Sequence, residues 1–245
     1  MTNLSWLSLH SNKLTGTLPP SIADLQELEE LHLNDNALEG PVPVGVLWLI
    51  ACEREVNLSA GMRLPGDMGD LGHSLESLVL ARRELVGSIP PSIGSLTSLQ
   101  VLNLQGNHLS GWIPQTISKL VNLGWLDLSC NELEGEIPAG ICNLTNLQEL
   151  ALNDNRLVGR IPDQIGQLGD LQTLHLQNNR LQGHLPRSIV NLQHIHVLSV
   201  ANNCLSGPVP EELTGLRYLE KLHLSGNAFG GECKRRTGTL VKSRC

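Results

Sequence analysis

The chain has 245 residues, of which 40% are hydrophobic and only 2% aromatic, and its formal net charge is −7. With so few rings to supply buried volume, aliphatic side chains must fill the core. The negative charge argues against nucleic acid as a partner, because nucleic-acid-binding proteins present basic surfaces. The longest apolar stretch, residues 44–52, falls short of the ~20 residues of a spanning helix, so we expect no membrane insertion of this segment.

A sequence repeat of 24 residues runs along most of the chain, and such self-similarity is typical of a repeat architecture. The frame fits residues 4–25 and 28–49, and from residue 96 onward it does not slip. One copy consists of Leu99, Leu102, Leu104, Asn107, Leu109, Gly111, Ile113, Pro114, Ile117 and Leu120. The pattern LxxLxLxxNxLxGxIPxxIxxL predicts one solenoid of about ten repeats over residues 1–232, because a single repeat cannot bury its own apolar face.

Each position of the repeat has a local structural meaning. The LxL segment predicts a short strand whose leucines face inward while their neighbours face solvent. Asn turns the chain away from the sheet and can satisfy backbone groups with its amide. Gly permits unusual backbone angles, Ile-Pro sets an extended segment, and IxxL predicts one helical turn.

The frame is damaged over residues 50–84. One repeat is shortened, with Gly61 in the Asn position, and the next has Arg83 in that position before Leu85 restores the motif. Loops in such scaffolds often carry function, so one hypothesis is a partner-binding island. The other is a decayed repeat that still stacks. In both cases we expect an irregular convex surface.

The repeat pattern resembles the leucine-rich-repeat family, and its LxGxIP segment is typical of the plant-specific class. The resemblance implies an α/β fold: a right-handed horseshoe with a concave parallel sheet and a convex side of short helical turns. Similar proteins include extracellular domains of plant receptor kinases, polygalacturonase-inhibiting proteins and repeat domains of algal Roco-type GTPases, all used for recognition. The resemblance therefore implies a non-catalytic module within a larger receptor or signalling protein. The alternative is a free-standing inhibitor of a secreted hydrolase.

Partner contacts are expected from strand residues that point outward on the concave face. A protein or peptide is the expected partner, no cofactor is implied, and the isolated chain is expected to be a monomer. Trp125 is the best single candidate, because exposed aromatic side chains often anchor interfaces. The full set of predicted contacts is Trp6, Glu30, His32, Val101, Asn103, Trp125, Asp127, Glu149, Thr173 and His175.

No catalytic or metal site is predicted. Asp127, His175 and Ser199 have the residue types of a triad, but Asp127 and His175 fall two strands apart, roughly 10 Å, too far for a direct hydrogen bond. His194 and His196 lack a third ligand at a suitable spacing and are interpreted as surface residues.

The remaining features bear on compartment. Six scattered cysteines, at positions 52, 130, 142, 204, 233 and 245, favour free thiols and a reducing compartment, although a bridge between Cys233 and Cys245 is conceivable. Possible glycosylation sites are Asn3, Asn57 and Asn143, but the repeat generates such triplets easily. No signal peptide is recognised, which favours an intracellular location unless the chain is an excerpt of a receptor. Residues 233–245 form a basic tail, interpreted as a solvated end or a docking arm.

Overall fold

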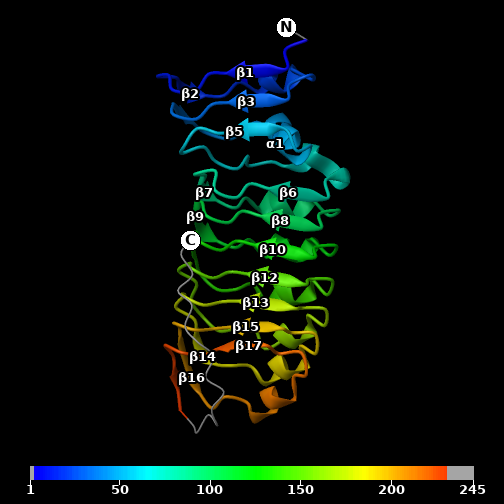
Figure 1. Cartoon of the computed structure of the whole chain (residues 1–245), viewed down its shortest axis with the longest axis vertical. Helices are drawn as coiled ribbons and strands as arrows, with labels where there is room; N and C mark the ends of the chain where they lie inside the picture. The colour runs from blue at the N-terminus through cyan, green and yellow to red at the C-terminus, as the bar shows by residue number, and fades with distance from the viewer. Residues whose placement is uncertain (1–2, 231–245) are drawn as a thin grey trace.

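The structure, a computed structural model, describes residues 3–230 apart from the side chain of His73. The chain coils into a solenoid whose strands succeed one another along the long axis (Figure 1). No helix among these residues is long and apolar enough to cross a membrane. This is the leucine-rich-repeat solenoid with a concave parallel sheet that the sequence predicts.

The concave surface consists of two parallel sheets with three and seven strands. Each strand is three residues long and begins one position before the central leucine or valine of its repeat. The three-stranded sheet contains β1 (Trp6–Ser8), β3 (Glu30–His32) and β5 (Glu55–Asn57). The seven-stranded sheet contains β6 (Ser77–Val79), β8 (Val101–Asn103), β10 (Trp125–Asp127), β12 (Glu149–Ala151), β13 (Thr173–His175), β15 (Val197–Ser199) and β17 (Lys221–His223).

A second set of short parallel strands follows the Asn turns and forms the lateral face. These are β2 (Thr15–Thr17), β4 (Ala37–Glu39), β7 (Val86–Ser88), β9 (His108–Trp112), β11 (Glu132–Glu134), β14 (Gln182–His184), β16 (Cys204–Gly207) and β18 (Ala228–Phe229). Glycine is required here twice over. Gly135 has a φ of +76°, and a Cβ atom there would approach Trp112 Cδ1 of the preceding repeat to 2.7 Å.

Short 3-10 turns form the convex side, most of them starting directly after a proline of the IP segment. They are η1 (Pro20–Asp24), η2 (Gly69–Ser74), η3 (Pro91–Ser95), η4 (Gln115–Lys119), η5 (Ala139–Asn143), η6 (Ile165–Gln167), η7 (Arg187–Asn191) and η8 (Glu211–Gly215). One repeat differs, because its apolar stretch forms the α-helix α1 (Val44–Ala51). The sequence frame predicted only a helical turn there.

The core is one continuous cluster of leucine, isoleucine and valine side chains, and the Asn positions line one side of it. Asn131 shows how the Asn ladder works. Its Nδ2 donates to the carbonyls of Leu104, Leu128 and Ser129, and its Oδ1 accepts from the Leu109 amide at 3.0 Å. Each such Asn therefore joins two repeats by satisfying backbone groups that the strands leave unpaired.

The concave sheet is interrupted between β5 and β6, a feature we call the sheet break. No Cα atom of β5 lies within 8 Å of a Cα atom of β6, whereas paired strands are about 4.8 Å apart. On the lateral face the chain stays connected, because Arg63 bridges Pro41 and Val86. The sequence predicted an irregular convex surface in this region, and the irregularity also reaches the concave face.

Candidate functional site

The concave face divides into three regions with different chemistry. On β3 and β5 lies an acidic cluster, defined as Glu30, His32, Glu55 and Asn57. His32 Nε2 is 3.3 Å from Glu30 Oε2 and 4.0 Å from Glu55 Oε1. Asn57 Nδ2 donates to His32 Nδ1 at 2.8 Å. The carboxylates hold the imidazole from two strands at once, so this cluster is an internally bonded polar surface.

The second region is apolar and lies on β6, β8 and β10. We call it the tryptophan patch and define it as Val79, Val101 and Trp125. Trp125 is paired in register with Val101, and Val79 lies one strand further along. Trp125 is 43% exposed and Val79 is 45% exposed. Two large apolar side chains therefore face solvent on a sheet whose other outward residues are mostly polar or small.

The third region, on β12, β13 and β15, has a floor of small side chains. Ala151 and Ser199 are buried on either side of His175, which is half-buried. Burial lowers the pKa of the His175 imidazole, and this effect outweighs the neighbouring Asp127 charge, which raises it. At neutral pH the ring is therefore an uncharged donor and acceptor on the sheet surface.

Asp127 differs from the expected solvent-facing contact, because it is buried. Its Oδ1 accepts from the Ser129 hydroxyl at 2.6 Å and from the Ser129 amide at 2.9 Å. The next strand carries Glu149, whose pKa is raised by burial and further by the Asp127 charge. Asp127 thus shapes the local field more than it offers a contact surface.

The other predicted contacts are at the sheet surface, with different accessibility. Trp6 and Glu30 are exposed, whereas Asn103, Glu149 and Thr173 are half-buried. Asp127 lies on β10 and His175 on β13, with β12 between them. The structure therefore keeps the two apart, as the strand order in the sequence implied.

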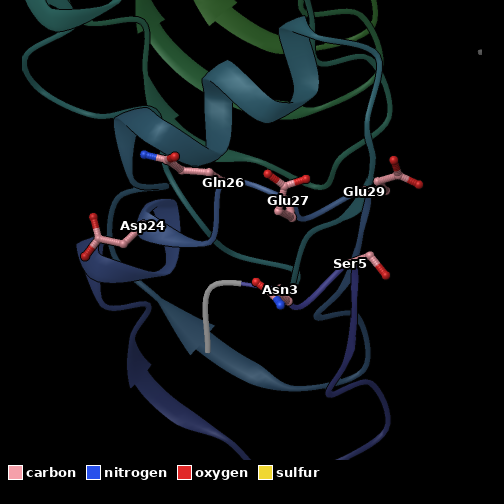
Figure 2. Close-up of a pocket in the computed structure, with 6 residues that line it drawn as sticks. All are labelled: Asn3, Ser5, Asp24, Gln26, Glu27 and Glu29. Carbon is pink, nitrogen blue, oxygen red and sulfur yellow. The ribbon is translucent and has the colours of Figure 1, made fainter.

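Two hollows are present near the N-terminal half of the chain. The first, about 560 Å³, lies beside the first repeats and is lined by Asn3, Ser5, Asp24, Gln26, Glu27 and Glu29. Figure 2 shows these side chains spread around the hollow and not converging on one point. Glu29 also pairs with Arg54 at 3.0 Å. The carboxylates thus form no concentrated site.

The second hollow, about 760 Å³, lies at the sheet break between residues that follow β5 and residues that follow β6. Arg83 is the half-buried basic residue on its wall. Burial lowers the pKa of the Arg83 guanidinium, and the Glu55 carboxylate across the break raises it. Sequence analysis flagged this stretch as irregular but missed the hollow, because a missing strand pairing leaves no motif.

Glycosylation, metal and cysteine predictions fall on varied environments. Asn143 is exposed, whereas Asn57 is engaged with His32. His194 and His196 both stack on Tyr218, and within residues 3–230 no group of three His, Cys, Asp or Glu is placed to hold a metal ion.

The cysteines are less uniform than expected. Cys130 is disulfide-bonded, which corrects the expectation of free thiols throughout, whereas Cys52, Cys142 and Cys204 are free. Burial raises the pKa of the Cys142 thiol to about 11. The conceivable Cys233–Cys245 bridge and the basic tail lie outside the described residues.

Comparison with known proteins decides the family. A model described as "Leucine rich repeat" matches residues 73–133, 98–157 and 169–229, and a second leucine-rich-repeat model matches residues 3–25. The chain belongs to the leucine-rich-repeat family. A curated leucine-rich-repeat relative, Receptor-like protein 31 of Arabidopsis thaliana, is 32% identical over 102 residues, or 40% of this chain and 12% of that protein.

Two solved leucine-rich-repeat structures show the same architecture. The plant peptide hormone receptor RGFR1 in complex with RGF2 has a TM-score of 0.72 and 30% identity, covering 90% of this chain and 35% of that one. The ectodomain of the Arabidopsis receptor kinase HAESA, in complex with an N-terminally extended IDA peptide hormone, has a TM-score of 0.69 and 32% identity, covering 91% and 38%. This leucine-rich-repeat chain therefore spans well under half the length of each.

Proposed function

We propose that this leucine-rich-repeat chain is a non-catalytic interaction domain that binds a peptide or protein segment on its concave face, as part of a larger receptor or signalling protein. The observation that carries the proposal is the exposed tryptophan patch on the seven-stranded sheet. A tryptophan standing on a rigid sheet can bury a large area with little loss of rotamer freedom, which is why such residues dominate binding energy at interfaces.

The surroundings of the patch fit a peptide ligand. On one side, the small side chains of β12 to β15 leave the backbone of a ligand room to approach the sheet. On the other side, the acidic cluster offers hydrogen-bond acceptors at Glu30 and Glu55. An apolar anchor flanked by polar groups is the usual arrangement of a binding surface, with the polar groups fixing orientation.

The titles of the similar solved structures support the same conclusion. RGFR1 and HAESA are both described in complex with peptide hormones. A peptide is therefore the partner class that we assign to this chain, and the tryptophan patch is where its main apolar side chain would rest.

The test uses two exposed tryptophans on different faces. Trp125 lies on the concave sheet, whereas Trp112 lies on the lateral face and is 73% exposed. A random library of 12-residue peptides would be selected on the full chain. The dissociation constants of the selected peptides would then be measured with Trp125→Ala and, as the matched control, Trp112→Ala.

We expect Trp125→Ala to weaken binding at least about tenfold, corresponding to ~1.4 kcal/mol, while Trp112→Ala leaves the dissociation constant unchanged. Melting temperatures would verify that both variants are folded. Equal loss in both variants, or loss only with Trp112→Ala, would place the binding surface elsewhere.

A further inference from the structure

Two rows of backbone groups lose their partners at the sheet break. In the regular repeats, the amide of the leucine after each concave strand donates to the carbonyl of the next strand's last residue. Leu33 donates to the Asn57 carbonyl at 2.7 Å, and Leu80 donates to the Asn103 carbonyl at 2.8 Å. Leu58 occupies the same position, but its amide makes no such bond, and the matching carbonyl belongs to Val79.

The other end of the strand repeats this observation. The amide of a strand's first residue normally donates one repeat back, as Val101 does to the Glu76 carbonyl at 3.1 Å. Ser77, the first residue of β6, makes no such bond to the chain before β5. Both edges of the break therefore present strand donors and acceptors that need a partner, since unpaired backbone groups are costly unless solvated or bound.

The separation of the two edges fits one additional strand. An inserted strand needs two inter-strand spacings, about 9.6 Å in all, and the Cα atoms of β5 and β6 are more than 8 Å apart. The hollow of about 760 Å³ opens at the same place and is lined on one side by Asn57, Leu58 and Ala60, and on the other by Ala81 and Arg83. It leads onto the carboxyl ends of both edges.

The floor and the outer side of the break constrain what can enter. Helix α1 packs against both β5 and β6, and the inward side chains of Val56 and Leu78 are already buried. The core beneath the break is thus closed without an occupant. On the outer side, Val79 is 45% exposed, because it lacks the neighbour that covers the corresponding residues in later strands.

We infer that the sheet break is a strand-addition site, in which an extended peptide segment lies between β5 and β6 and pairs its backbone with both edges. The inference rests on the proposed function and specifies how the ligand is held. Strand addition is a known mode of peptide recognition, in which main-chain hydrogen bonds give affinity and alternate side chains give specificity. The residue level with Val56 and Leu78 faces the closed core and must be small, as glycine or alanine is. The residue beside Val79 faces outward and is apolar.

A proline at Ser77 tests the pairing directly. Proline is tolerated at the first residue of a strand when its nitrogen faces a free edge, and the Ser77 amide makes no bond that the substitution would break. We expect Ser77→Pro to weaken the selected peptides at least tenfold with little change in melting temperature. The matched control, Ser77→Val, keeps the amide and should bind as the wild type does. Equal binding by the two variants would overturn strand addition.

A second measurement uses the unmodified protein. Hydrogen exchange of the Leu58 and Ser77 amides should be fast in the free chain and at least tenfold slower with a selected peptide. N-methylation of the peptide residue that pairs with these edges should abolish both the slowing and the binding. Slow exchange before any peptide is added would show that the chain itself, or a second copy, covers the edges, and would contradict the inference.

The two proposals fail in distinguishable ways. If Trp125→Ala weakens binding while Ser77→Pro and peptide binding leave the break unaffected, the peptide lies on the concave face without insertion. The proposed function then stands and strand addition does not. If Trp125→Ala has no effect, the concave contact itself is wrong.

Discussion

The seven-stranded and three-stranded sheets are built on the same leucine frame, yet they part between β5 and β6. In the seven-stranded region the Asn ladder is continuous from Asn107 to Asn227, each amide joining successive repeats. At the break the two consecutive ladder positions hold Gly61 and Arg83. Leucines continue through both regions and keep the core closed. The comparison teaches that apolar packing holds the repeats together, whereas the Asn amides set the strand spacing.

The largest expected effect comes from a charge in the core of each region. Leu126 in β10 and Leu31 in β3 are fully buried at equivalent positions. Leu126→Asp should cost more than about 4 kcal/mol, because an unpaired buried carboxylate disrupts packing on both sides. We expect it to unfold the seven-stranded region, as followed by circular dichroism during urea denaturation.

Leu31→Asp should act more locally, because solenoid stability is a sum of neighbour terms and β5 is unpaired with β6. Hydrogen exchange should show loss of protection in β1, β3 and β5 while β10 to β15 stay protected. Uniform loss along the whole chain would mean that the break does not separate the two regions.

Removing one Asn of the ladder should have the next largest effect. Asn131→Ala leaves the Leu109 amide without its acceptor, together with several carbonyls, and should cost about 2–3 kcal/mol. Asn122→Ala is the control, since this exposed amide makes a single printed bond to the Thr97 carbonyl and should cost at most about 0.5 kcal/mol. Equal costs in urea titrations would refute the importance that we give to the ladder.

Restoring the ladder at the break sharpens the comparison from the other side. Arg83→Asn replaces a half-buried guanidinium with an amide that can donate and accept along the backbone, and should stabilise the chain by about 1 kcal/mol. A rise in melting temperature would be the readout. If stability falls or stays the same, the shortened repeat and not the missing amide causes the break.

The smallest effect is the pH dependence from His175. Burial lowers its pKa in the folded chain, so the unfolded chain binds more protons, and stability rises with pH between the folded-state pKa and about 6.5. Acidification through that range should therefore destabilise the protein, by less than about 1 kcal/mol because the ring is partly exposed. His223 and Lys221 contribute to the lowering and Asp127 opposes it. His175→Gln should remove this component from melting curves recorded across pH 5–8.

Much of the fold follows from the sequence because each repeat position has one structural task. The strands begin where the LxL pattern placed them, and the turns follow the IP prolines. Helix α1 was not predicted, since its residues fit the frame of a turn while also forming a continuous apolar run. The sheet break was located but its nature was not, because backbone pairing between repeats depends on geometry that no single repeat encodes.

The candidate site was only partly visible in the sequence. Alternation along a strand identified Trp125 and Val101 as outward residues, and the structure places both on the concave face. The burial of Asp127 could not be foreseen, because it depends on the hydrogen bonds from Ser129 and on the height of the neighbouring side chains. Val79 was overlooked as a contact, since its exposure results from the missing strand beside it.

The most direct test of the whole account is a crystal structure of the full chain with a library-selected peptide. The account predicts a peptide lying on the concave face, with an apolar side chain covering Trp125 and an extended segment between β5 and β6. A peptide bound to the lateral or convex side, with Trp125 still exposed to solvent, would contradict it.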